Sequence, residues 1–360
     1  MTHREKRSGI IARVALILVC TNVFAGNGSA AGGGHYVTVE PGVRIHYDVL
    51  GSGVPIFMIA GGPGANSSRF RYTHSLLKPL GKLVYIDNRG RGRSTEVKAA
   101  APGANTYSLE ADVMDVEAVR RALEAERIII YGHSYGSMVA MAYASRFPQH
   151  TLALCTTSGI HGARVWQERN IDVVKRFLAN HYPKRWARIV ALRDAGHLTG
   201  QGELADLFQG IEELYAYNPE SEQRLHAQFE DFKDRKSTLF NPEVYRAMVG
   251  ADPEWTIGGT LAAVELLPEL RNYTGPALIM GGRFDRICPP INQVEIADAL
   301  PGARLVIFEK SGHAPFIEEP LRFLTVFSGF LEEVIPPGTR PKVPRSQDSA
   351  NDRNSSGTSP

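Results

Sequence analysis

The sequence predicts an α/β fold: a mostly parallel central sheet flanked by helices, with an inserted helical cap. Short continuous apolar runs, typical of strands buried on both faces, recur along the chain. Segments with apolar residues at helical spacing alternate with these runs, which favours a parallel sheet. Between about 161 and 272 the strand-like runs stop, and the sequence becomes mostly helical and more charged. That interruption predicts the cap.

Strands are expected from the start of the folded region. "HYVTVEPGVRIHYDVLG" (35–51) alternates polar and apolar residues around Pro41-Gly42, the pattern of a β-hairpin. "VPIFMIA" (54–60) is the first expected buried strand. Runs of the same kind follow at 82–87, 127–132, 152–158, 276–282 and 303–309.

Helices are expected between the later strands. "SLEADVMDVEAVRRAL" (108–123) places apolar residues at helical spacing behind Ser108, a residue type that caps helix N-termini. Similar patterns occur at 137–148, 291–300 and 321–334. We therefore assign 35–160 and 273–335 to the α/β core and 161–272 to the cap.

The two ends of the chain differ from the core. Residues 1–31 combine a basic start, a short apolar segment (14–26) and small residues, which is the pattern of a signal peptide and a short linker. The apolar segment is well below the ~18–20 residues that span a bilayer, so we expect export to the periplasm or medium without a stable membrane span. The tail 336–360 lacks apolar periodicity and is expected to be disordered.

Composition excludes several classes of partner. The formal net charge is +2, which does not suggest a nucleic-acid partner. No Cys/His cluster has metal-ligand spacing, so no metal is expected. Cys155 and Cys288 remain after signal cleavage, and we expect two unpaired thiols rather than a disulfide. The sequence does not indicate an oligomeric state.

A nucleophile motif occurs at "GHSYG" (132–136). Gly-x-Ser-x-Gly between a buried strand and a helix is typical of a tight turn that holds the serine out at the top of a sheet. The alternative is an ordinary serine in a glycine turn. The position between strand and helix favours Ser134 as the nucleophile.

A serine nucleophile needs a base, and the base needs an orienting carboxylate. "MGGRFDRICPP" (280–290) follows one expected strand and presents Asp285. "FEKSGHAPFIEEP" (308–320) follows the last strand and presents His313. This order, Ser then Asp then His, with each residue after its own strand, predicts a catalytic triad.

Acyl transfer also needs donors for the oxyanion. One donor is expected to be the backbone N–H of Tyr135, which follows the nucleophile. The other is expected from "FMIAGGPGANS" (57–67), where Gly62 is the candidate. The alternative is a glycine turn that binds nothing.

"YIDNRGRGRS" (85–94) carries Asp87 with Arg89, Arg91 and Arg93. The arginines suggest either anion binding or a loop stabilised by ion pairs. We favour the ion pairs.

With these motifs in view, residues 35–335 resemble the prolyl iminopeptidase-like branch of the α/β-hydrolase fold, peptidase family S33. The resemblance rests on the Gly-Gly-Pro-Gly loop (61–64), "DNRGRGRS" (87–94), "GHSYG" (132–136), "GRFDRICPP" (282–290) and "GHAPFIEEP" (312–320). It implies a serine hydrolase that removes N-terminal residues, often proline, from peptides.

The resemblance also implies that acidic cap residues bind the substrate's free α-amine. The match falls on Glu254, for which a solvated helix-end carboxylate is the alternative. Glu212 and Glu213 are possible second ligands of the amine.

The chain departs from the family pattern at three places. Ala60 stands where the family usually has His, and Asn88 stands where Gln is common. "VWQERN" (165–170) also differs from the Trp-x-x-Trp-Glu run of many caps. These departures bear on how strictly the chain prefers proline.

The sequence therefore favours a serine aminopeptidase that acts through an acyl-Ser134 intermediate. The same triad would also serve an esterase or lactonase. An epoxide hydrolase or dehalogenase is disfavoured, because those relatives use Asp in place of Ser134. A non-catalytic binding module is disfavoured because all three triad residues are present. No cofactor is expected, since serine acyl chemistry needs none.

Overall fold

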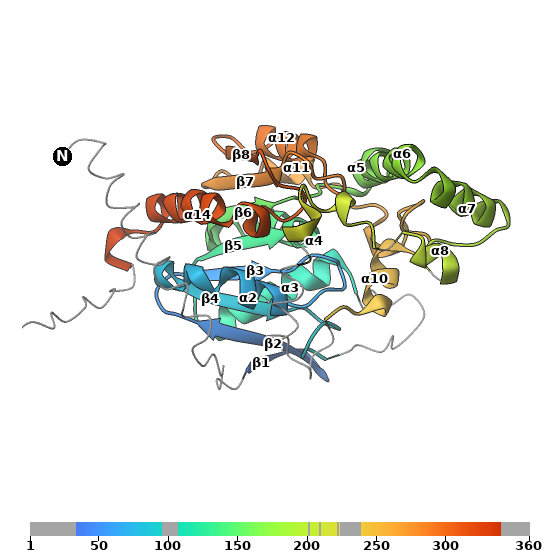
Figure 1. Cartoon of the computed structure of the whole chain (residues 1–360). Coiled ribbons are helices and arrows are strands. Elements are labelled where there is room, and N and C mark those ends of the chain that lie inside the picture. Colours follow the sequence, from blue (N-terminus) through green and yellow to red (C-terminus); the bar gives the residue numbers. More distant parts are fainter. Residues whose placement is uncertain are drawn as a thin grey trace, which may run out of the picture.

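A computed structural model describes 34–95, 107–200, 202–208, 210–221, 223 and 239–339 (Figure 1). The predicted signal peptide (1–31) lies outside these residues, as does most of the predicted tail, 340–360.

An eight-stranded sheet forms the centre of the described chain, in the order β1-β2-β4-β3-β5-β6-β7-β8 (Figure 1). Its strands are β1 His35–Glu40, β2 Val43–Leu50, β3 Pro55–Ile59, β4 Lys82–Asp87, β5 Ile128–His133, β6 Thr151–Thr157, β7 Ala277–Gly282 and β8 Arg304–Phe308. The pairs β1–β2 and β2–β4 are antiparallel, and every other pair is parallel. This confirms the predicted mostly parallel sheet.

The first two strands form the predicted hairpin. Tyr36 pairs with His46, and the turn between the strands contains Gly42 at φ +81°. Glycine adopts this left-handed conformation without the steric cost that a Cβ imposes.

Helices cover both faces of the sheet. The core helices are α2 Ser68–His74, α3 Leu109–Ala122, α4 Tyr135–Arg146, α12 Pro290–Asp298, α13 Pro315–Glu318 and α14 Pro320–Val334, with short 3₁₀ turns η2 Ser75–Leu80, η3 Pro148–His150 and η7 Pro337–Thr339. The Ser108 side chain accepts a hydrogen bond from the Ala111 N–H at 3.1 Å, so the predicted cap of α3 is confirmed.

Each central strand is buried on both sides. In β5, Ile128 and Ile130 join the core beneath α3 and α4, whereas Ile129 and Tyr131 join the core beneath α14. All four side chains are fully buried. Two covered faces explain why these strands read as continuous apolar runs instead of alternating ones.

The chain between β6 and β7 forms helices and turns in its described part. They are α5 Ala163–Val165, the π-helical turn η4 Trp166–Asn170, α6 Ile171–His181, α7 Pro183–Asp194, α8 Gly202–Asp206, η5 Glu212–Leu214, α10 Pro242–Val249, η6 Gly259–Leu261 and α11 Leu267–Leu270. Leu178, Ile189, Leu204 and Leu214 are buried together in a small core of this segment. The segment extends away from the sheet in Figure 1, where α7 lies farthest from it.

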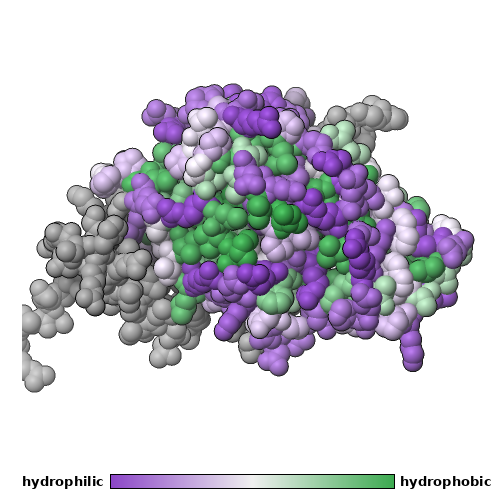
Figure 2. Space-filling view, turned by 90° about the horizontal axis from the view of Figure 1, so that it is seen from above, coloured by the Kyte–Doolittle hydropathy of each residue, from purple (hydrophilic) through white to green (hydrophobic). Residues whose placement is uncertain are grey.

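The surface carries both hydrophilic and apolar side chains (Figure 2). Figure 2 shows a mostly hydrophilic face with apolar side chains gathered near its centre. Across the described residues, no helix combines the length and apolar character needed to cross a membrane.

Two of the arginines of 85–94 pair with carboxylates on α3. Arg89 binds Asp115 and Arg91 binds Asp112, with nearest ion-pair distances of 2.7 Å in both cases. The structure therefore confirms the expected loop-stabilising ion pairs.

Asp87 is the buried acceptor that closes this loop. Its carboxylate accepts hydrogen bonds from the Ser67 N–H at 2.9 Å, the Ser67 hydroxyl at 2.7 Å and the Arg93 N–H at 3.2 Å. His46 Nδ1 lies 3.2 Å away. Burial alone would raise the pKa of Asp87, but the hydrogen bonds from His46 and Ser67 hold it below its ordinary value.

Replacing Asp87 by Asn should lower the free energy of unfolding at neutral pH by about 1–3 kcal/mol, because buried donors lose a charged acceptor. The folded-state pKa lies below the ordinary value of 3.8. The carboxylate therefore stabilises the fold above that value, and this contribution disappears as the pH falls through the folded-state pKa. Urea unfolding should show a difference between wild type and variant that narrows in acid. A difference independent of pH would contradict the assignment.

Candidate active site

Ser134 lies in the sharp turn between β5 and α4. Its backbone has φ 55° and ψ −125°, a conformation that non-glycine residues rarely adopt. The Ser134 N–H donates to the Thr157 carbonyl at 3.0 Å, and its carbonyl accepts from the Ser137 N–H at 2.9 Å. These bonds to β6 and α4 hold the turn in its strained form.

The two glycines of the motif allow this turn. A Cβ at Gly132 would collide with the Gly136 carbonyl oxygen. A Cβ at Gly136 would collide with the Ile59 carbonyl oxygen of β3. Both glycines are therefore required by close backbone approach, which agrees with the interpretation of the motif as a nucleophile elbow.

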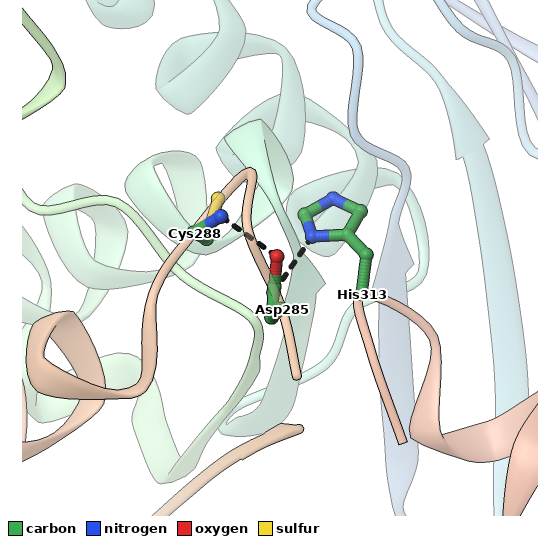
Figure 3. A group of neighbouring side chains, drawn as sticks. All are labelled: Asp285, Cys288 and His313. Atoms are coloured by element: carbon green, nitrogen blue, oxygen red, sulfur yellow. Dashed lines mark hydrogen bonds and ion pairs between the residues drawn. The ribbon is translucent and has the colours of Figure 1, made fainter. Parts of the chain in front are cut away.

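Asp285 and His313 meet at the ends of neighbouring strands (Figure 3). His313 Nδ1 lies 2.8 Å from Asp285 Oδ2. The other carboxylate oxygen accepts the backbone N–H groups of Ile287 at 2.9 Å and Cys288 at 2.8 Å. Asp285 is 3% exposed and His313 7% exposed. The sheet thus brings together the two residues that the sequence places 28 positions apart.

Two neighbours hold the backbone of His313. The His313 N–H donates to the Tyr215 carbonyl. The His313 carbonyl lies 2.8 Å from His133 Nε2, which must carry the proton of that hydrogen bond. Burial, reinforced by nearby His313, lowers the pKa of His133 well below its ordinary value, so His133 is a neutral donor. Sequence reasoning missed both contacts.

The glycine loop (61–64) lies directly against Ser134. A Cβ at Gly61 would lie 2.8 Å from Ser134 Cβ and 3.4 Å from Ser134 Oγ. The next residue, Gly62, has φ +118° and precedes Pro63. Tyr135 begins α4, where a helix leaves backbone N–H groups without intrahelical acceptors. Of the two expected oxyanion donors, Tyr135 therefore adjoins Ser134 in the chain, and Gly62 adjoins Gly61, which lies against Ser134.

Cys288 joins the same cluster (Figure 3). Its sulfur, an Asp285 carboxylate oxygen and a His313 ring nitrogen lie within 4.8 Å of one another. Burial and then the Asp285 charge raise the pKa of the thiol, while a hydrogen bond with Ser134 opposes the rise. The spacing Asp-x-x-Cys is visible in the sequence, but it does not show that the thiol faces Asp285 and His313. Cys155 and Cys288 are both unpaired, as expected, and the structure shows that both are buried.

Glu254 is a half-buried carboxyl of the cap. Burial raises its pKa to about 7, against the opposing charge of Lys175. Its charge in turn contributes to the raised pKa values of Tyr215 and Tyr245. The Tyr215 ring also lies beside His313, with 5.9 Å between the two ring centroids.

The two other acidic candidates are engaged within the cap. Glu213 accepts a hydrogen bond from the Tyr182 hydroxyl at 2.8 Å. Glu212 accepts one from the Gln223 side chain at 2.8 Å. Neither contact connects its carboxylate to Asp285 or His313.

Comparisons with known proteins agree with this geometry. Residues 54–320 match the family model described as alpha/beta hydrolase fold. A proline iminopeptidase of Heyndrickxia coagulans is 26% identical over 288 residues, which cover 80% of this chain and 94% of that protein. A proline iminopeptidase of Saccharolobus solfataricus is 28% identical, covering 84% and 95% respectively.

A solved structure is also similar. The proline iminopeptidase of Mycobacterium smegmatis aligns with a TM-score of 0.67 at 23% identity, covering 84% of this chain and 98% of that one. The sheet order, the strand-end position of Asp285 and His313, and the family match lead to one conclusion. The chain belongs to the α/β hydrolase fold family and is similar to proline iminopeptidases within it.

Proposed function

We propose that this protein is a serine aminopeptidase of the proline iminopeptidase type, peptidase family S33, which hydrolyses the amide bond after a peptide's N-terminal residue. The observation that carries the proposal is the half-buried carboxyl of Glu254 in the cap, whose pKa is raised by burial to about 7, in a chain that also holds the buried Asp285–His313 pair. The proline iminopeptidases among the relatives support the same activity.

The triad would perform acyl transfer in two steps. Ser134 Oγ attacks the carbonyl carbon of the scissile amide while His313 Nε2 accepts the hydroxyl proton. The carboxylate of Asp285 holds the Nδ1–H tautomer and stabilises the imidazolium. His313 then donates the proton to the leaving amine. Water attacks the acyl-Ser134 ester with His313 again as base, and the freed Ser134 recovers its proton.

The Tyr135 and Gly62 N–H groups would stabilise the oxyanion of each tetrahedral intermediate. Burial keeps His133 neutral, so the imidazolium of His313 forms without a second cation beside it. This matters because the two rings have centroids only 4.7 Å apart.

Glu254 would bind the protonated α-amine of the substrate. A half-buried carboxylate with a raised pKa gains more from a cationic partner than a solvated one does, because little water competes for it. Nearby Lys175 lies over the Trp255 ring, with Nζ 3.8 Å from its centroid, and partly compensates the charge before substrate arrives.

An esterase or lactonase would use the same triad without an amine-binding carboxylate. Aminoacyl-naphthylamides, including proline's, compared with p-nitrophenyl esters, separate the two activities. Turnover of esters with no cleavage of any free-amine amide would refute the aminopeptidase proposal.

Ser134→Ala should abolish both activities while the protein remains folded. Loss of a serine nucleophile removes covalent catalysis, and kcat is expected to fall by about 10⁴-fold or more. Initial rates under saturating substrate, with circular dichroism as the folding control, check this. Retention of wild-type turnover would show that another group attacks the substrate.

Glu254→Gln should raise KM for free-amine substrates by about 10- to 100-fold, since a charged hydrogen bond contributes about 1.5–3 kcal/mol. The KM of N-blocked esters should stay within about twofold, because these substrates carry no cation for the carboxylate. Glu213→Gln is a matched control, since its carboxylate bonds to Tyr182 within the cap. Equal effects of Glu254→Gln on both substrate classes would remove the proposed role.

The pH dependence of binding should follow Glu254. Its pKa is about 7, so its carboxylate is ionised above that pH and becomes protonated below it. The kcat/KM for free-amine substrates should therefore fall by roughly tenfold per pH unit below the pKa of Glu254. Dividing this kcat/KM by that of an N-blocked ester removes the pH dependence that the two substrates share. In Glu254→Gln this ratio should be flat with pH, and a ratio that still falls would assign the ionisation to another group.

A further inference from the structure

Arg91 connects the two segments that flank the nucleophile. It is 3% exposed. Its Nε donates to the Pro63 carbonyl in the glycine loop. Its Nη1 and Nη2 donate to the two carboxylate oxygens of Asp112, at 2.7 and 2.9 Å. Asp112 is fully buried and also accepts the Tyr135 hydroxyl at 2.6 Å.

Every donor of the Arg91 guanidinium has a partner. Besides Pro63 and Asp112, Nη1 donates to the Arg89 carbonyl at 3.0 Å, and Nη2 lies 3.1 Å from Met248 Sδ on α10. An arginine offers five N–H donors in a fixed planar fork, whereas a lysine offers three on a flexible stem. The position therefore demands arginine geometry and not only a positive charge.

The Arg91–Asp112 pair lies between the two oxyanion donors of the proposed function, so the role inferred for it below rests on that function. Pro63 follows Gly62 directly, and Tyr135 supplies the second donor. Oxyanion donors act only when they lie about 2.7–3.1 Å from the developing charge. A displacement of about 1 Å at such a site can cost 100-fold in rate. A buried ion pair by itself is weak grounds for stability, because desolvation opposes its Coulombic gain.

We infer that Arg91 and Asp112 are positioning residues, whose buried pair fixes the glycine loop (61–64) against the first turn of α4. The chain of contacts runs from the Pro63 carbonyl through Arg91 and Asp112 to the Tyr135 hydroxyl. It sets the spacing between the Gly62 and Tyr135 N–H groups. Arg91 and Asp112 touch neither the substrate nor the reacting atoms.

The chain offers a matched control in Arg89 and Asp115. This pair comes from the same loop and the same helix, is equally buried, and is also bidentate, with contacts of 3.1 and 2.7 Å. Arg89 extends instead to Glu40 of β1, at 2.6 Å. The side-chain hydrogen bonds of Arg89 and Asp115 join these residues to each other, to Glu40 and to the Arg89 N–H, and not to Pro63 or Tyr135. Both pairs hold the loop to α3, but one alone reaches the oxyanion donors.

The test compares Arg91→Lys and Asp112→Asn with Arg89→Lys and Asp115→Asn. Arg91→Lys and Asp112→Asn should lower kcat by about 10- to 100-fold with KM within about threefold. The control variants should keep kcat within about threefold, even where they lower the melting temperature as much. Equal loss of kcat in both pairs would show a general structural role and overturn the inference, and so would unchanged kcat in Arg91→Lys.

A second measurement reports the oxyanion site directly. An aldehyde analogue of the substrate forms a tetrahedral adduct with Ser134, whereas the free product amino acid does not. The inhibition constant of the aldehyde should rise in parallel with the loss of kcat, while that of the product stays constant. Parallel weakening of both inhibitors would assign the defect to the substrate pocket and overturn the inference.

Tyr135→Phe keeps the test decisive if the charged variants do not fold. It removes a single hydroxyl and leaves the ring in place, so kcat should fall by about 3- to 10-fold with the aldehyde weakened to the same extent. A wild-type kcat in this variant would contradict the inference. Should the wild-type enzyme cleave only esters, the aminopeptidase proposal fails, yet the same comparison runs on the ester, because both reactions form the same oxyanion.

Discussion

The strained backbone of Ser134 is the constraint on which the site depends. A non-glycine residue at φ 55° and ψ −125° persists only when its surroundings enforce it. Here β5 leads into the turn, α4 leads out of it, and the Thr157 carbonyl of β6 accepts the Ser134 N–H. Gly132 and Gly136 let these backbones approach closely enough. The sheet core therefore supplies the stability that the turn itself lacks.

The buried carboxylates near the turn all have hydrogen-bond donors, and two of them form ion pairs with arginines. Asp87, Asp112 and Asp115 are fully buried, and each carboxylate has donors from the loop that follows β4. Removing an ion from water costs free energy that only good geometry and further hydrogen bonds offset. These networks consequently tolerate few alternative loop conformations. Two of the three lie on α3, which packs against α4, so the order of the loop is transmitted to the helix that carries Tyr135 at its start.

The sequence was sufficient for the order of the strands and for the core helices α3, α4, α12 and α14, because local periodicity marks these elements. It did not predict the short helices α2 and α13. It also located Asp285 and His313, since parallel strands carry their functional side chains just beyond their carboxyl ends. The start of α4 was wrong by two residues: the helix begins at Tyr135, because Gly136 belongs to both the turn and the helix.

Contacts that depend on the direction of side chains in loops could not be predicted from the periodicity of the sequence. Cys288 faces the cluster because Asp285 Oδ1 accepts its N–H and curls the loop back on itself. His133 reaches the His313 carbonyl across 180 positions of sequence. Tyr215 and Glu254 belong to the cap, where apolar spacing identifies helices but not which end faces the core. Local sequence patterns do not indicate which residues far apart in the chain come into contact.

The cap and the glycine loop form one continuous structure at their junction. Ala65 forms an antiparallel bridge with Phe240, and the Asn241 N–H donates to the Gly64 carbonyl at 2.9 Å. The Asn241 side chain donates to the Gly90 carbonyl at 2.8 Å and its oxygen caps α10. The loop beside Ser134 is therefore held from the core side by Arg91 and from the cap side by Asn241. A loop that is fixed from both sides cannot shift with the core alone or with the cap alone. The position of the cap helices is therefore coupled to that of the glycine loop beside Ser134.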